Sequence, residues 1–211
     1  KEYWRRRGNM QVADIPNIDW VLIGAAFKLL TNAKKRQVTK HASGHFGCGK
    51  MMKIWKFQDH SKCPRCPKPY EDPRHILCCP APSARAHWIT AVTKLKSWMT
   101  KNHTMPESTT AIIQSLHSWP NPRNNPPTLR STTKRYGLQK AMFEQNTIGW
   151  YNFLMGRISV RWQHVQQQYF EWLKRRNTGK AWATALLKKV WEVSWDLWDH
   201  RNEVRLSTLS P

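Results

Sequence analysis

The chain has 211 residues, with 35 Lys and Arg against 13 Asp and Glu, which gives a formal net charge of +22. This imbalance excludes an ordinary cytosolic metabolic enzyme and predicts attraction to a polyanion. The most apolar stretch, residues 20–30, contains Lys28 and is too short to span a bilayer, so we expect no membrane partner. The chain begins without an initiator Met or an apolar leader, which predicts a nuclear or cytoplasmic protein that is not secreted.

Helical periodicity of apolar residues covers most of the chain. Helices are predicted, in chain order, at 18–40, 50–57, 83–99, 106–119, 137–176 and 180–205. Ser83 is the expected N-cap of the third of these helices, and Gly156 is a predicted interruption of the fifth. No alternating strand pattern of any length occurs. The sequence therefore predicts a mostly α fold of bundle-like helical segments without a substantial sheet.

Composition divides the chain into five expected segments. The segment 120–127 (PNPRNNPP) is the clearest linker, because it holds four prolines and three asparagines. The expected segments are an N-terminal helical segment with a basic end (1–43), a Gly-rich turn with a short helix and a CCHC knuckle (44–82), a helical pair (83–119), a Pro/Asn-rich linker (120–136) and Trp-rich long helices (137–211).

Thirteen tryptophans outnumber the phenylalanines and tyrosines together, so the core must be built largely on indole rings. In the last predicted helix, Leu187, Trp191, Trp195 and Trp198 recur at helical spacing. Such a stripe is typical of a helix interface, and we expect core packing before any role in base stacking.

The most specific motif is a group of cysteines and one histidine. Cys63 and Cys66 form a C-x2-C pair, and His75 and Cys79 follow at a spacing that can complete a tetrahedron around one metal ion. Cys78 is the rival of Cys79 for the fourth position. Six prolines between residues 61 and 82 prevent a long helix there, so a structural Zn²⁺ would supply the stability that this small irregular knuckle lacks.

Two other interpretations of the cysteines carry less weight. A redox or disulfide role for Cys63 and Cys66 would need neither His75 nor Cys79, and the βαβ setting typical of redox CxxC pairs is missing from the pattern. Cys48 lies in a glycine-rich turn 15 residues before Cys63, and we expect it to be a spare thiol. A site with four protein ligands has no open position for water and is therefore expected to be structural.

The segment GHFGCGKMMKIW followed by CPRC and EDPRHILCCP resembles the zinc-binding region that follows the polymerase domain in reverse transcriptases of non-LTR (LINE-like) retrotransposons. IGWYNFLMGRISVRWQHVQQQYF and WDLWDHRNEV are also similar to such reading frames. Many relatives place one more residue between the histidine and the last cysteine, which keeps Cys78 open as a ligand. The positions that match the motif are Cys63, Cys66, Glu71, His75, Ile76, Leu77, Cys79 and Trp88.

No catalytic residue is predicted. Polymerases and nucleases need clustered carboxylates for metal ions, and the six aspartates are scattered at 14, 19, 59, 72, 196 and 199. The resemblance implies that the polymerase site lies upstream of this chain. Asp196, Asp199, His200 and Glu203 share one helix, where a metal site is conceivable; the expected arrangement is a solvated face with a hydrogen bond between Asp196 and His200.

Basic residues concentrate around the knuckle and predict binding of RNA, DNA or both through phosphates. His45, Phe46 and Tyr70 are the expected base-stacking residues. The alternative is a helical protein-interaction module that docks on the polymerase portion of the same polypeptide or on another copy. The candidate nucleic-acid contacts are Lys34, Lys35, Arg36, Lys40, Lys50, Lys53, Lys56, Lys62, Arg65, Lys68 and Arg74.

Overall fold

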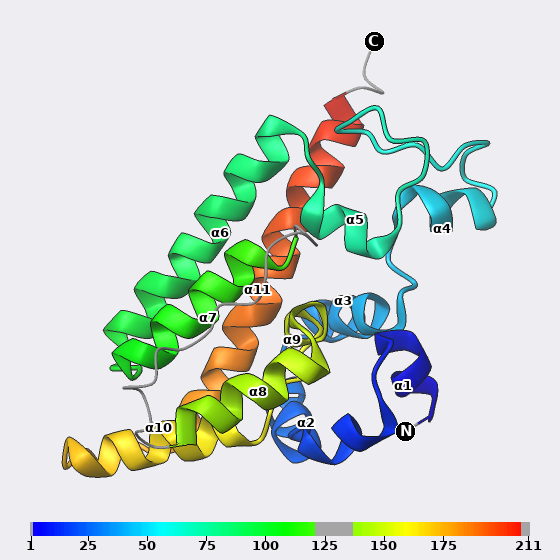
Figure 1. The fold of residues 1–211 in the computed structure, drawn as a ribbon. Coiled ribbons are helices and arrows are strands. Elements are labelled where there is room, and N and C mark those ends of the chain that lie inside the picture. Colours follow the sequence, from blue (N-terminus) through cyan, green and yellow to red (C-terminus); the bar gives the residue numbers. More distant parts are fainter. Residues whose placement is uncertain (1, 121–136, 208–211) are drawn as a thin grey trace.

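The computed structural model describes residues 2–120 and 137–207, and these residues are mostly helical (Figure 1). They contain no strand, only one isolated antiparallel bridge between Ile18 and Ser159. The mostly α fold is therefore confirmed. Beyond Pro120, the expected linker lies outside the described residues. The elements are α1 (Glu2–Gly8), the 3₁₀ helix η1 (Val12–Asn17), α2 (Trp20–Lys28), α3 (Asn32–Ser43), α4 (Gly49–Ile54), α5 (Pro73–Cys78), α6 (Pro82–Lys101), α7 (Pro106–Ser118), α8 (Leu138–Ile148), α9 (Trp150–Leu154), α10 (Arg161–Trp172) and α11 (Gly179–Ser207).

The predicted helix at 18–40 is wrong as a single element, because the structure divides it into α2 and α3. Thr31 adopts an extended backbone, and its side-chain oxygen accepts a hydrogen bond from the Lys34 backbone N–H at 3.4 Å. This is the bonding of an N-cap, so a new helix begins at Asn32. The two helices also differ in what they bury, since α2 buries Leu22 and Ala26 whereas the buried residue of α3 is His41.

Prolines set the beginnings of α5 and α6. Pro82 occupies the first turn of α6 with Ala81 at the N-cap position, so the predicted N-cap at Ser83 is wrong. In α5, Pro73 follows Asp72, whose carboxylate accepts a hydrogen bond from the His75 backbone N–H at 2.7 Å. A short capped helix of six residues therefore lies inside the segment that the prolines keep from forming a longer one.

Glycines interrupt the predicted helix at 137–176 at two places. Gly149 has φ +93° and separates α8 from α9, and Gly156 has φ +90° in the turn before α10. A Cβ at Gly156 would lie 2.6 Å from Nε1 of Trp191. The predicted interruption at Gly156 is confirmed, and its cause is a left-handed backbone pressed against the indole ring of α11.

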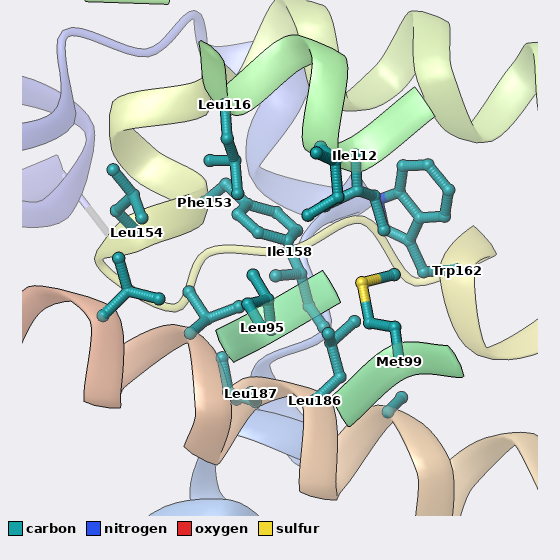
Figure 2. Close-up of a cluster of buried hydrophobic side chains, with 14 of the residues drawn as sticks. Leu95, Met99, Ile112, Leu116, Phe153, Leu154, Ile158, Trp162, Leu186 and Leu187 are labelled. Carbon is teal, nitrogen blue, oxygen red and sulfur yellow. The ribbon is translucent and has the colours of Figure 1, made fainter. Parts of the chain in front are cut away.

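Helix α11 is the central element of the core, since it packs against α2, α5, α6, α9 and α10. It runs beside α6 along the length of the molecule (Figure 1). One cluster of buried side chains extends from α2 to α11. Figure 2 shows its centre, with Leu95, Met99, Ile112, Leu116, Phe153, Leu154, Ile158, Trp162, Leu186 and Leu187.

The tryptophan stripe of α11 lies at the helix interface as predicted. Leu187 and Trp191 are buried, and Trp198 packs on the Phe46 ring with centroids 5.2 Å apart. Trp195 is half-buried. None of the helices in the two described ranges is both long and apolar enough to cross a bilayer.

A buried ion pair joins the cysteine-containing segment to the end of α11. Glu71 is 0 % exposed and Arg201 is 1 % exposed. The Arg201 Nη2 and Nε donate to Glu71 Oε2 at 2.5 and 3.1 Å, and the Gly49 backbone N–H donates to the same oxygen at 2.7 Å. One carboxylate therefore holds α4, the loop before α5 and α11 together.

We expect Arg201→Met to lower the free energy of unfolding by about 3–5 kcal/mol, because it leaves the Glu71 carboxylate buried without its cation. The double variant Glu71→Gln with Arg201→Met removes both charges and keeps an acceptor for Gly49, so it should recover at least half of this loss. Urea unfolding of the wild type, the two single variants and the double variant measures the coupling energy between Glu71 and Arg201. A loss in the double variant equal to the sum of the two single losses would contradict this coupling.

A second expectation concerns pH. His41 in α3 is buried and stacks on Phe46 at 4.9 Å, and burial, with a smaller effect of Arg157, lowers its pKa from 6.5 to about 3. The unfolded chain protonates this histidine below pH 6.5 while the folded chain does not, so stability falls as the pH falls. Between pH 7 and 5 the loss from His41 is about 2 kcal/mol. In urea unfolding, His41→Leu should lose less stability over this range, whereas exposed His45→Leu should behave as the wild type.

Candidate metal centre

Four side chains converge on one point in the segment between α4 and α6. The ligand atoms of Cys63, Cys66, His75 and Cys79 all lie within 4.8 Å of one another, and none of these cysteines forms a disulfide. Two of the pairs are Cys63 Sγ to Cys79 Sγ at 3.9 Å and Cys66 Sγ to His75 Nε2 at 3.4 Å. Tetrahedral Zn²⁺ with ordinary bond lengths separates two sulfurs by about 3.8 Å and a sulfur from a nitrogen by about 3.6 Å. The cluster therefore has the dimensions of a metal site.

The first two cysteines lie in a loop closed by main-chain hydrogen bonds. The backbone N–H of Cys63 donates to Lys68 O at 3.0 Å, and that of Glu71 donates to Ser61 O at 2.7 Å. The Arg65 backbone N–H donates to Cys63 Sγ at 3.4 Å. Amide donors toward a sulfur favour the thiolate, which is the form that binds metal ions.

Helix α5 and its C-cap supply the other two ligands. His75 lies in the first turn of α5 and is buried, while Cys79 is the residue at which the helix ends. Cys78 points elsewhere, because its Sγ donates to the Arg74 carbonyl at 3.2 Å. The structure therefore places Cys79 with the predicted ligands and leaves Cys78 outside the cluster.

The thiols differ in protonation. The hydrogen bond between the two sulfurs lowers the pKa of Cys63 and raises the pKa of Cys79, which favours one thiolate in the pair. Burial raises the pKa of Cys78 and of Cys48, which both remain protonated thiols. Cys48 is fully buried beside Phe46 and Met51, away from the cluster, as expected of a spare thiol.

One of the predicted nucleic-acid contacts, Arg65, is held within the fold by hydrogen bonds. The Arg65 guanidinium donates to Ile76 O at 2.7 Å and to Leu197 O at 3.5 Å, which connects the Cys63–Cys66 loop to α5 and α11. The other ten predicted cations are exposed or half-buried, and none forms an ion pair within the described part of the chain.

The structure brings only some of these cations together. Lys50 and Arg74 line one hollow, next to Arg7 and Arg157, which the sequence analysis did not single out. Lys34 lies at a different hollow, with Lys188 of α11. The basic run RRRG at residues 5–8 could have indicated the cations of the first hollow. Nothing in the sequence indicates which helix packs beside this run.

The predicted base-stacking residues differ in their exposure to solvent. Phe46 is 1 % exposed between His41 and Trp198, so its expected role in base stacking is wrong. His45 is exposed, and Tyr70 is exposed with Lys50 Nζ 5.8 Å from its ring centroid. Sequence alone could not distinguish these rings, because burial of Phe46 depends on α11.

The acidic side chains of α11 do not have the predicted partners. Asp196 pairs with Lys94 of α6 at 3.0 Å, and His200 is buried and stacks on His87 with centroids 3.6 Å apart. The expected hydrogen bond between Asp196 and His200 is wrong, because α6 supplies a partner to each of them. Asp199 and Glu203 join no metal-binding group within residues 2–120 and 137–207.

The fold and this cluster define a helical protein with a Cys₃His site. No protein-family model matches the chain, and neither the curated proteins nor the solved structures contain a match to it.

We expect Cys63→Ser and Cys79→Ser to lose bound metal, because each removes one of four ligands. Cys78→Ser is the matched control and should keep the wild-type metal content, which elemental analysis of the purified proteins measures. The reverse result, with metal retained in Cys79→Ser and lost in Cys78→Ser, would assign the fourth ligand to Cys78.

Proposed function

We propose that this chain is a non-catalytic, zinc-containing, nucleic-acid-binding region similar to that of a retroelement reverse transcriptase. The observation that carries the proposal is the convergence of Cys63, Cys66, His75 and Cys79, the four residues that match the family motif. The bound polymer would be template RNA or target DNA, and the polymerase portion of the same polypeptide is the proposed neighbour.

The donor set favours zinc as the metal. Three sulfurs and one imidazole nitrogen form a borderline-soft tetrahedral set of the kind that structural Zn²⁺ prefers. All four positions are taken by the protein, so the ion would hold the loop and α5 together and would not activate water. Its stabilising effect matters here because the hydrophobic cluster that contains the cysteines is small, with Cys63, Cys79, Ala81 and Ala84 as its buried members.

Exposed lysines around the site supply the proposed affinity for nucleic acid. Lys53, Lys56, Lys62 and Lys68 are all exposed and have no carboxylate partner among the described residues. Neutralising phosphates with such side chains releases counterions and gives binding with little sequence preference. The same charge imbalance leaves few carboxylates for catalysis, so the proposal places polymerase chemistry outside this chain.

A second candidate function is protein docking. Ile54, Trp55 and Phe57 are exposed at and beyond the end of α4, with Phe57 at 71 % exposure. Exposed aromatic residues of this kind are typical of interaction surfaces. A protein that bound the polymerase portion and showed no affinity for nucleic acid would favour this function.

The test is titration of the zinc-loaded chain with RNA and DNA oligonucleotides at two salt concentrations. If about six cations contact phosphates, log K for a duplex should fall with log salt at a slope of roughly −5. Removing the metal with a chelator should weaken binding, because the loop that carries Lys62 and Lys68 loses its support. Absent or salt-insensitive binding by the zinc-loaded chain would contradict the proposal.

A further inference from the structure

Two adjoining hollows lie between α1, α5 and α9, with volumes of about 460 and 220 Å³. Three residues, Arg7, Arg74 and Tyr151, line both of them, so the hollows are immediate neighbours. The larger hollow has the size of a small-molecule site, typically about 300–1,000 Å³. We refer to the two hollows together as the arginine groove.

Positive side chains dominate the arginine groove. Its cations are Arg7, Lys50, Arg74 and Arg157, and its one carboxylate is Asp72. That carboxylate is engaged as the N-cap of α5. Neither Arg7 nor Arg74 forms an ion pair within the described residues. An anionic ligand would therefore meet a net excess of positive charge from four different elements.

Local packing holds the arginines in place. The Arg7 guanidinium lies over Gly44, in the space that a Cβ there would take, 1.0 Å from Nη2. Arg157 is buried and donates to Asn152 Oδ1 at 2.7 Å and to Ala42 O at 3.3 Å. Side chains that are positioned before a ligand arrives lose less conformational entropy on binding.

Aromatic side chains form the other wall. The Arg74 guanidinium lies 5.4 Å from the centroid of the Trp119 ring, and Tyr151 packs on the same ring at 5.9 Å. The Trp119 Nε1 is buried and has no hydrogen-bond partner among the described residues. Tyr70, exposed at the opposite end of the groove, presents a ring beside Lys50.

These observations indicate the class of ligand. Arginine side chains bind phosphates through charge-assisted hydrogen bonds, and exposed aromatic rings stack on bases. A polymer that offers both groups is a nucleic acid. In a duplex the faces of the bases are already stacked on one another, so a duplex offers phosphates but no free base face to this groove. A single strand has separate bases and a narrow backbone, so it can enter.

Resting on the proposed function, we infer that the arginine groove binds a segment of single-stranded nucleic acid. Arg7 and Arg74 contact its phosphates, and Tyr70 stacks on a base. The groove thus gives the chain a preference for single strands that the diffuse charge of its surface does not supply.

The test compares two double variants with equal loss of charge. Arg7→Gln with Arg74→Gln removes the groove contacts, while Arg175→Gln with Arg176→Gln removes two exposed arginines that follow α10 (Figure 1). The groove variant should bind a single-stranded oligonucleotide about tenfold more weakly than the wild type, and its salt slope should shrink by about 1.4. The control variant should change affinity much less, and duplex binding should respond equally little in both.

Equal weakening of single-strand binding by the two variants, or equal loss for single strand and duplex in the groove variant, would overturn this inference and leave the proposed function intact. A wild-type chain that binds no oligonucleotide would overturn both. Thermal melting and metal content of each variant verify the fold. If the groove variant unfolds, Arg7→Gln alone provides the same test, because this exposed side chain at the end of α1 forms no ion pair with a described residue.

Discussion

The buried pair of Glu71 and Arg201 is the constraint on which the arrangement of the candidate metal site depends. Two charges removed from water are tolerated only when each is fully hydrogen-bonded, and here the carboxylate receives the guanidinium and the Gly49 amide together. Its main chain adds a further link, since the Lys50 N–H donates to the Glu71 carbonyl at 2.9 Å. The Cys₃His segment is thereby fixed against α11, on which its helix α5 also packs.

Two kinds of support thus act on one short segment. Near the cysteines, the hydrophobic cluster is small, so a metal ion bound by the four side chains would have the larger local effect. Farther from them, Arg65 and Glu71 connect the loop to α11 through hydrogen bonds. A segment with little regular structure thereby both presents exposed lysines and contributes Arg74 to the wall of the arginine groove.

The sequence predicted the features that depend on nearby residues. Helical periodicity, the break at Gly156 and the spacing of the four metal ligands are all local patterns. The break at Thr31 was missed because one threonine at a cap looks like any polar helix residue. Contacts between distant segments have no local pattern in the sequence that would predict them. Glu71 contacts Arg201 across 130 positions, and Arg157 contacts Ala42 across 115. Burial of Phe46 and the composition of the arginine groove depend on such contacts.

The position of α11 in the core also bears on how the chain acquires its structure during synthesis. Residues of α2, α5, α6, α9 and α10 all pack on this helix, yet it is made after every one of them. The four residues of the candidate metal site all lie between positions 63 and 79, so they leave the ribosome long before Arg201, and until then the Glu71 carboxylate stays in water. The candidate site and the hydrophobic core therefore reach their final arrangement together, when α11, the last helix of the described residues, packs against the elements made before it.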